Sequence, residues 1–187
     1  IRDVAVTGVQ TCALPISARA RGCEEVIAVS KSLQADKEFQ RQIADWRAEY
    51  KPGERLADYA SLGVGGAADI IVLRDHAALE PLVAGLRERG IEWRLLGGGT
   101  NILPVDEPFE RVFLHLAPGI NDWQIDGRNV RVSAAASLGR TVMHCAKHSL
   151  GGMEGLSGVP GSVGGALRMN AGRSEEHTSE LQSRLHL

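Results

Sequence analysis

Hydrophobic and polar positions alternate with two different periods along the chain, and this predicts a mixture of strands and helices. Residues 68–73 form a nearly continuous, β-branched apolar run, which is typical of a buried strand. The helix expected over 76–89 places its apolar residues at i, i+3, i+4 and i+7 from Leu79, and Gly90 follows as a stop. A second short strand at 93–96 completes a strand–helix–strand unit, whose strands are normally parallel.

The rest of the patterned sequence divides into further elements. A polar helix is expected from Ser30 to Tyr50, ended by Lys51-Pro52-Gly53. Another strand is expected over 111–116, followed by a hairpin of 122–125 and 129–134 around the turn Asp126-Gly127. Ser137 is a candidate N-cap of a helix that runs to Ser149.

Three consecutive glycines, Gly97 to Gly99, follow the strand at 93–96 and precede Thr100 and Asn101. Glycines at this point present backbone N–H groups with no Cβ in the way, which suits a phosphate or pyrophosphate held against the main chain. A plain glycine turn between two strands is the alternative. The position of the loop at the carboxyl end of a strand in a strand–helix–strand unit favours the phosphate interpretation.

A second glycine-dense stretch covers residues 151–172. Pro160-Gly161-Ser162 and Gly164-Gly165 are interpreted as turns whose amides, together with the Ser162 hydroxyl, face an anion or a planar ring. The embedded apolar residues favour a buried loop that covers a ligand over a flexible linker. A P-loop is excluded because no Gly-Lys-Ser/Thr follows the glycines, and a Rossmann fingerprint is excluded because Gly97–Asn101 leads toward another strand.

Composition narrows the class of protein. The 187 residues are 43% hydrophobic and 24% charged, with a net charge of −2, so a basic surface for nucleic acid is not indicated. No apolar window reaches the roughly 18 residues that a membrane span needs. The 3 cysteines lack metal or disulfide spacing, and Cys145 is expected to pack in the core. His144 and His148 are expected at the surface, because no third metal ligand accompanies them.

The two ends of the chain carry a separate signal. Residues 7–16 and 173–183 can be encoded by opposite strands of one oligonucleotide, which resembles a sequencing-library adapter. We therefore expect residues 1–17 and 173–187 to be translated adapter and flanking DNA rather than parts of the fold. The expected organisation is an N-terminal helical segment over 18–54 and an incomplete domain over 55–172, which the resemblance described next identifies as an FAD-binding domain.

Three motifs together carry a family resemblance. SLGVGGAAD (61–69), LLGGGTNILPVDEPF (95–109) and GMEGLSGVPGSVGGALRMNAG (152–172) resemble, in order and spacing, the UDP-N-acetylenolpyruvoylglucosamine reductase family. The resemblance implies an α+β fold: the two-subdomain FAD-binding fold of the vanillyl-alcohol oxidase type, truncated before the substrate-binding domain. It also implies FAD as cofactor, NADPH as hydride donor, a nucleotide-sugar substrate and a bacterial cytoplasmic location. Neither nucleic acid nor a membrane is expected as a partner. The implied FAD-binding residues are Gly97, Gly98, Gly99, Thr100, Asn101, Ile102, Gly155, Pro160, Gly161, Ser162, Gly164, Gly165, Asn170, Ala171 and Gly172.

The chain also departs from the family pattern. The family continues past Gly172 with an alanine, a tyrosine and a glycine, where this chain has Arg173. The residues that the family uses for protonation have no counterpart here, so no catalytic residue is assigned and Ser137, Ser157 and Ser162 are not given that role. Two alternatives stay open: another FAD-linked oxidoreductase of the same fold, or a flavin-binding fragment without turnover.

Overall fold

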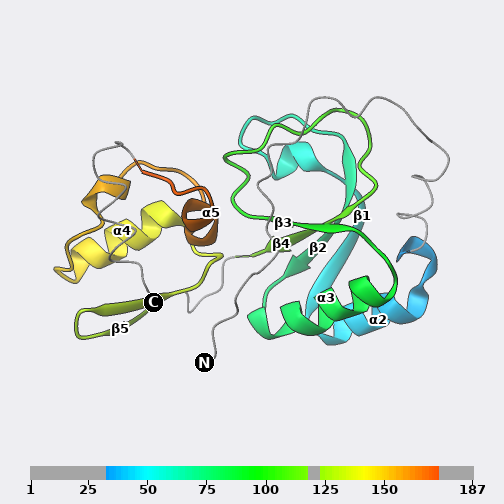
Figure 1. The fold of residues 1–187 in the computed structure, drawn as a ribbon, viewed down its shortest axis with the longest axis horizontal. Coiled ribbons are helices and arrows are strands. Elements are labelled where there is room, and N and C mark those ends of the chain that lie inside the picture. Colours follow the sequence, from blue (N-terminus) through cyan, green and yellow to red (C-terminus); the bar gives the residue numbers. More distant parts are fainter. Residues whose placement is uncertain (1–32, 118–122, 173–187) are drawn as a thin grey trace.

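The computed structural model describes residues 33–117 and 123–172, which form two lobes. Figure 1 shows the larger first lobe (33–117) on the right and the smaller second lobe (123–172) on the left. The two terminal segments interpreted as adapter, 1–17 and 173–187, lie outside the described residues, as do residues 18–32. The predictions made for them stay predictions.

The first lobe is built on a four-stranded sheet of order β1-β2-β4-β3. β2 and β3 each pair with β4 in parallel, whereas β1 runs antiparallel to β2. Its strands and helices are α2 (Lys37–Asp45), β1 (Ala48–Arg55), β2 (Ala67–Leu73), α3 (Leu79–Glu88), β3 (Trp93–Leu96) and β4 (Val112–Leu116), with short 3-10 turns η1 (Leu56–Asp58) and η2 (His76–Ala78).

Each face of this sheet buries its own apolar cluster. Helices α2 and α3 lie on one face, where Phe39 and Leu82 are fully buried with Ile71 and Leu114 of the sheet (Figure 1). The segment that follows β1 covers the other face, where Leu56 packs with buried residues of β2 and β3. The loop that follows β3 therefore begins directly after Leu96, a residue of this second apolar cluster.

The second lobe is a hairpin packed against helices. Its elements are β5 (Trp123–Asp126), β6 (Asn129–Val132), α4 (Leu138–Lys147), η3 (Glu154–Leu156) and α5 (Val163–Arg168). β5 and β6 pair antiparallel, and Leu138, Leu156 and Val163 form a third buried cluster with half-buried residues of the hairpin. Within the described residues, no helix is both long enough and apolar enough to cross a bilayer.

The locally encoded elements are confirmed. The strand–helix–strand unit appears as β2–α3–β3, with β4 inserted between its two parallel strands. Asp126 and Asn129 pair across the predicted turn, where Gly127 takes a φ of 58°. Ser137 caps α4 by accepting a hydrogen bond from the Arg140 amide at 3.4 Å.

Two expectations are corrected. The helix predicted from Ser30 to Tyr50 ends at Asp45, and the residues expected to stop it lie inside strand β1. Pairing with β2 overrides local helix propensity there, and a bulge between Lys51 and Glu54 accommodates the proline and glycine. The stretch 151–172, expected to be a loop, contains η3 and α5.

Candidate functional site

The glycine loop that follows β3 packs against the segment after η1, which contains Tyr59 and Ser61. Gly97 and Gly98 are exposed, whereas Gly99 is buried with a φ of 64°. A Cβ on Gly99 would collide with the carbonyl oxygen of Tyr59, and the Ser61 amide donates to the Gly99 carbonyl at 3.0 Å. Both the backbone angle and the close approach therefore require glycine at position 99.

The second glycine-rich motif meets this loop directly. A Cβ on Gly98 would lie 3.0 Å from the Cα of Gly161, and one on Gly97 would lie 2.8 Å from the Oγ of Ser162. Thr100 donates its hydroxyl to the carbonyl of Pro160 at 3.5 Å, a long bond. Two segments about sixty positions apart in the sequence thus pack backbone against backbone at the junction of the lobes. We call them the glycine junction (residues 97–101 and 160–162).

Several backbone donors remain available at this junction. Among the described residues, no hydrogen-bond acceptor is found for the N–H groups of Gly98, Thr100, Asn101, Gly161 or Ser162. Gly98, Thr100 and Asn101 are exposed, and none of the five side chains is charged. Main-chain amides on two adjoining loops, without a competing carboxylate, are a donor set that suits a diphosphate group. The site is unlike a Lys-bearing P-loop, because it offers dipoles rather than a cationic side chain.

The start of α5 is occupied differently from what the sequence suggested. Ser162 is buried, and its Oγ accepts from the Gly165 amide at 3.2 Å as the N-cap of α5. The amides of Val163 and Gly164 donate to carbonyls of the 134–136 turn at 2.9 Å. The amides of Gly164 and Gly165 therefore already donate to protein groups, and the Ser162 oxygen accepts one hydrogen bond. That these three residues contact the cofactor stays a prediction.

Of the other predicted cofactor residues, Ile102 belongs to the first lobe, and Gly155 and residues 170–172 belong to the second. Ile102 is half-buried and packs on the apolar cluster beneath the loop. Gly155 lies in η3, and a Cβ there would meet nothing within 4 Å, so no close approach explains this glycine. Asn170 takes a left-handed φ of 49° after α5, and Ala171 closes the turn by donating to the Ala166 carbonyl at 2.9 Å. Gly172 is exposed.

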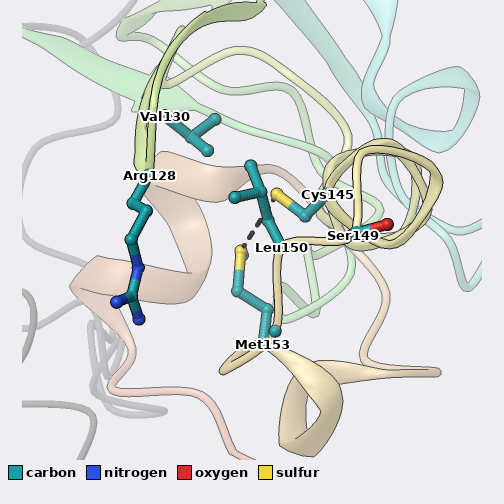
Figure 2. A pocket seen from close by; sticks show the side chains of 7 residues that line it. Arg128, Val130, Cys145, Ser149, Leu150 and Met153 are labelled. Atoms are coloured by element: carbon teal, nitrogen blue, oxygen red, sulfur yellow. Dashed lines mark hydrogen bonds between the residues drawn. The ribbon is translucent and has the colours of Figure 1, made fainter.

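A surface hollow on the second lobe lies apart from this junction. It has a volume of about 470 Å³ and is lined by residues of the β5–β6 turn, β6, α4 and the segment after α4, none of which belongs to either half of the glycine junction. In Figure 2, Cys145 points toward Met153, and its thiol donates to the Met153 sulfur at 3.6 Å. Burial raises the pKa of the Cys145 thiol, which fits the packing role expected for it.

Sequence reasoning missed two residues that support the junction from below, Tyr59 and His115. The half-buried rings of these residues meet edge to face, with centroids 5.3 Å apart. No local pattern marks either residue, because the segment after η1 and strand β4 are brought together only by the folded sheet. A signal for Tyr59 is its position just before the motif at 61–69, which the family resemblance had already singled out.

The fold and the site together define an α+β cofactor-binding unit in which two glycine-rich loops meet. The family model described as "FAD binding domain" matches residues 67–185, more than half of the chain. The chain belongs to the FAD binding domain family, and FAD is the cofactor that this membership indicates.

The relatives of known name that this chain resembles share one enzyme name. The chain is 36% identical over 129 residues to the UDP-N-acetylenolpyruvoylglucosamine reductase of Bacillus licheniformis, covering 68% of this chain and 43% of the relative. It is 32% identical over 135 residues to the reductase of the same name from Bacillus subtilis, covering 72% and 45%. A crystal structure of the Thermus caldophilus enzyme superposes with a TM-score of 0.55 at 34% identity, covering 67% of this chain and 43% of that chain. The chain thus spans less than half the length of these relatives.

Proposed function

We propose that this chain is the FAD-binding part of a UDP-N-acetylenolpyruvoylglucosamine reductase. In the whole enzyme, NADPH would serve as hydride donor, and the enolpyruvyl group of a UDP-linked amino sugar would be reduced for peptidoglycan synthesis in the bacterial cytoplasm. The observation that carries the proposal is the glycine junction, where two motifs of this family meet backbone to backbone. The relatives named for this reaction support it.

The residues of the junction would hold the diphosphate of FAD. The amides of Gly98, Thr100 and Asn101 approach from one lobe, and those of Gly161 and Ser162 from the other. Because no Cβ projects at Gly98 and Gly161, the two loops approach each other closely, and this would bring the amides of both loops to one anion. Ile102, Gly155 and residues 170–172 would line the rest of the cofactor site. Gly164 and Gly165 would contact FAD only through their Cα atoms, because their amides already donate to protein groups.

FAD, when bound, supplies the hydride chemistry between the nicotinamide donor and the substrate double bond. The chain's own contribution is to bind and orient that cofactor through neutral dipoles at the junction of two lobes. No side chain of the glycine junction is an acid or a base with a pKa near neutrality. The proposal therefore assigns no proton transfer to this chain and expects it to bind FAD without turnover.

The experiment is a titration of the purified 187-residue chain with FAD, followed by quenching of flavin fluorescence. Gly98→Ala is the informative variant, because Gly98 has an ordinary φ and its Cβ would meet only the Gly161–Ser162 backbone. We expect weaker FAD binding in this variant. Gly139→Ala is the matched control, because a Cβ there meets nothing within 4 Å. Equal FAD affinity in all three proteins, or no FAD binding by a folded chain, would contradict the proposal.

A second candidate is another FAD-linked oxidoreductase of the same fold. Enzymes that attach flavin covalently need a histidine or cysteine at the flavin, and neither half of the glycine junction contains one. Acid precipitation of the FAD-loaded chain distinguishes the two. Release of all flavin into the supernatant supports the reductase proposal, whereas flavin that stays with the protein favours the alternative.

A further inference from the structure

His115 occupies a particular place beneath the glycine junction. It lies near the end of β4, on the sheet face opposite α2 and α3, and it pairs with Val72 on one side and Leu96 on the other. Its neighbours Val112 and Leu114 on the same strand point to the opposite face and are fully buried in the helix-covered core. His115 is half-buried and lies between two apolar partners, Val72 and Leu96, in its cross-strand row.

The imidazole contacts both sides of the glycine loop. Its Nδ1 lies 3.2 Å from the carbonyl oxygen of Leu96, the last residue of β3. A carbonyl can only accept, so Nδ1 carries the proton and donates. The other contact is the edge-to-face packing on Tyr59. The carbonyl of Tyr59 touches Gly99, so the ring supports the loop indirectly at its middle as well as at its start.

We propose that His115 is a positioning residue for the FAD-binding loop, holding Leu96 and Tyr59 so that residues 97–101 face the second lobe. The expected effect of His115 on FAD affinity rests on the proposed function. The expected effect of His115 on the position of residues 97–101 does not. His115 would act through Leu96 and Tyr59 and need not touch the cofactor.

The protonation state fits this role. Burial lowers the pKa of His115, and this outweighs the opposing effect of the Leu96 and Gly97 backbone. The positive charge of Lys51 on β1 lowers the pKa further. Glu49 shares the cross-strand row of His115 through Val72, and its carboxylate is paired with Lys51 and Arg74 at 3.8 and 3.6 Å. A neutral ring with its proton on Nδ1 is therefore the species that donates to Leu96 at pH 7.

Three substitutions of His115 and one control separate the effect of the hydrogen bond from that of simple packing. His115→Asn places an amide N–H near the position of Nδ1 and should restore the bond to Leu96. His115→Leu keeps comparable bulk and cannot donate, and His115→Gln serves the same purpose if the leucine variant does not fold, because its N–H lies farther from the backbone. Val72→Ala is the matched control, since it removes buried volume beside His115 and leaves the hydrogen bond in place.

The primary measurement is amide hydrogen exchange in the FAD-free chain. The Ser61 amide reports the loop because it donates to Gly99 at 3.0 Å, and the Val112 amide reports the far end of β4 because it donates to Glu92 at 2.9 Å. Loss of one hydrogen bond should speed Ser61 exchange about five- to tenfold in the leucine variant. Val112 exchange should stay unchanged, and the asparagine variant should match the wild type at both amides.

FAD affinity gives the second measurement. We expect the dissociation constant to rise about five- to tenfold in His115→Leu and to recover in His115→Asn. Unchanged Ser61 exchange in His115→Leu, failure of the asparagine to restore it, or the same selective effect in Val72→Ala would each overturn the inference. A wild-type chain that binds no FAD would overturn the proposed function instead, and the exchange of Ser61 would still decide the role of His115.

Discussion

The backbone of Gly98 faces that of Gly161 so closely that a Cβ on Gly98 would lie only 3.0 Å from the Gly161 Cα. The contact joins a loop of the first lobe to the segment that enters α5 in the second. Side chains are excluded at the point of contact, so main-chain amides gather where the lobes meet. The glycines therefore serve the packing of the two lobes as well as the binding of an anion.

Gly99 should be the least replaceable glycine of the loop. An alanine at a φ of 64° is strained, and its Cβ would collide with the Tyr59 carbonyl. We expect Gly99→Ala to lower the free energy of unfolding by at least about 2 kcal/mol. Urea denaturation followed by circular dichroism measures this change.

Gly139→Ala tests whether the loss of stability in Gly99→Ala is specific to position 99 or follows from replacing any glycine. Gly139 lies inside α4 with open space around its Cα, so alanine should stabilise the helix by up to about 1 kcal/mol. Opposite signs for the two variants are the expected result. A Gly99→Ala protein as stable as the wild type would show that the Tyr59 contact is not present in solution.

Ser162 should behave as a helix cap rather than as a ligand donor. Ser162→Ala removes the acceptor of the Gly165 amide, and we expect the free energy of unfolding to fall by about 1 kcal/mol. Ser137→Ala, at the cap of α4, should cost a similar amount. Thermal denaturation of the wild type and of both variants measures these two losses of stability. A Ser162→Ala chain that keeps its stability and loses FAD affinity would show instead that the hydroxyl binds the cofactor.

Asp36 should contribute to stability only above acidic pH. Its side chain caps α2 by accepting from the Phe39 amide at 2.9 Å, and it pairs with Arg89 at 2.9 Å. The hydrogen bonds from Arg89 and Phe39 hold the pKa of Asp36 below its usual value. Because the folded-state pKa is the lower one, the stabilisation is present above about pH 4 and is lost as the pH falls through the folded pKa.

Asp36→Asn tests this pH dependence. Asparagine can still cap the helix but carries no charge, so the variant should lose less stability than the wild type between about pH 4 and pH 2. Urea denaturation at a series of pH values measures the difference. Parallel stability curves for the two proteins would mean that Asp36 has the same pKa in the folded and unfolded chains.

The sequence was sufficient where the determining contacts are local. The apolar face that begins at Leu79 and the Asp126-Gly127 turn each specify their element within a few residues. The insertion of β4 between β2 and β3 depends on pairing between distant strands, which no local pattern records. The same distinction applies to the site. Both glycine motifs were found as segments, but their contact, and the support from His115, depend on the folded sheet.

Strand β1 shows how a long-range contact overrides a local pattern. Tyr50 was expected in a helix, yet its hydroxyl donates at 2.6 Å to the buried carboxylate of Asp69 on β2. The Gly53 amide donates to the same carboxylate at 2.9 Å, across the bulge. Burial and the negative charge of Asp69 raise the pKa of Tyr50, so the phenol stays protonated and remains a donor at neutral pH.

Tyr50→Phe removes this donor and keeps the ring. A buried carboxylate deprived of one hydrogen bond is costly, so the free energy of unfolding should fall by about 1–3 kcal/mol. Tyr59→Phe is the control, because no bond of its hydroxyl is found in the described part of the chain, and its stability should change by less than about 0.5 kcal/mol. Equal effects of the two substitutions in urea denaturation would show that the Tyr50–Asp69 bond does not hold β1 in the sheet. A selective loss in Tyr50→Phe would identify that bond as a reason why these residues form a strand.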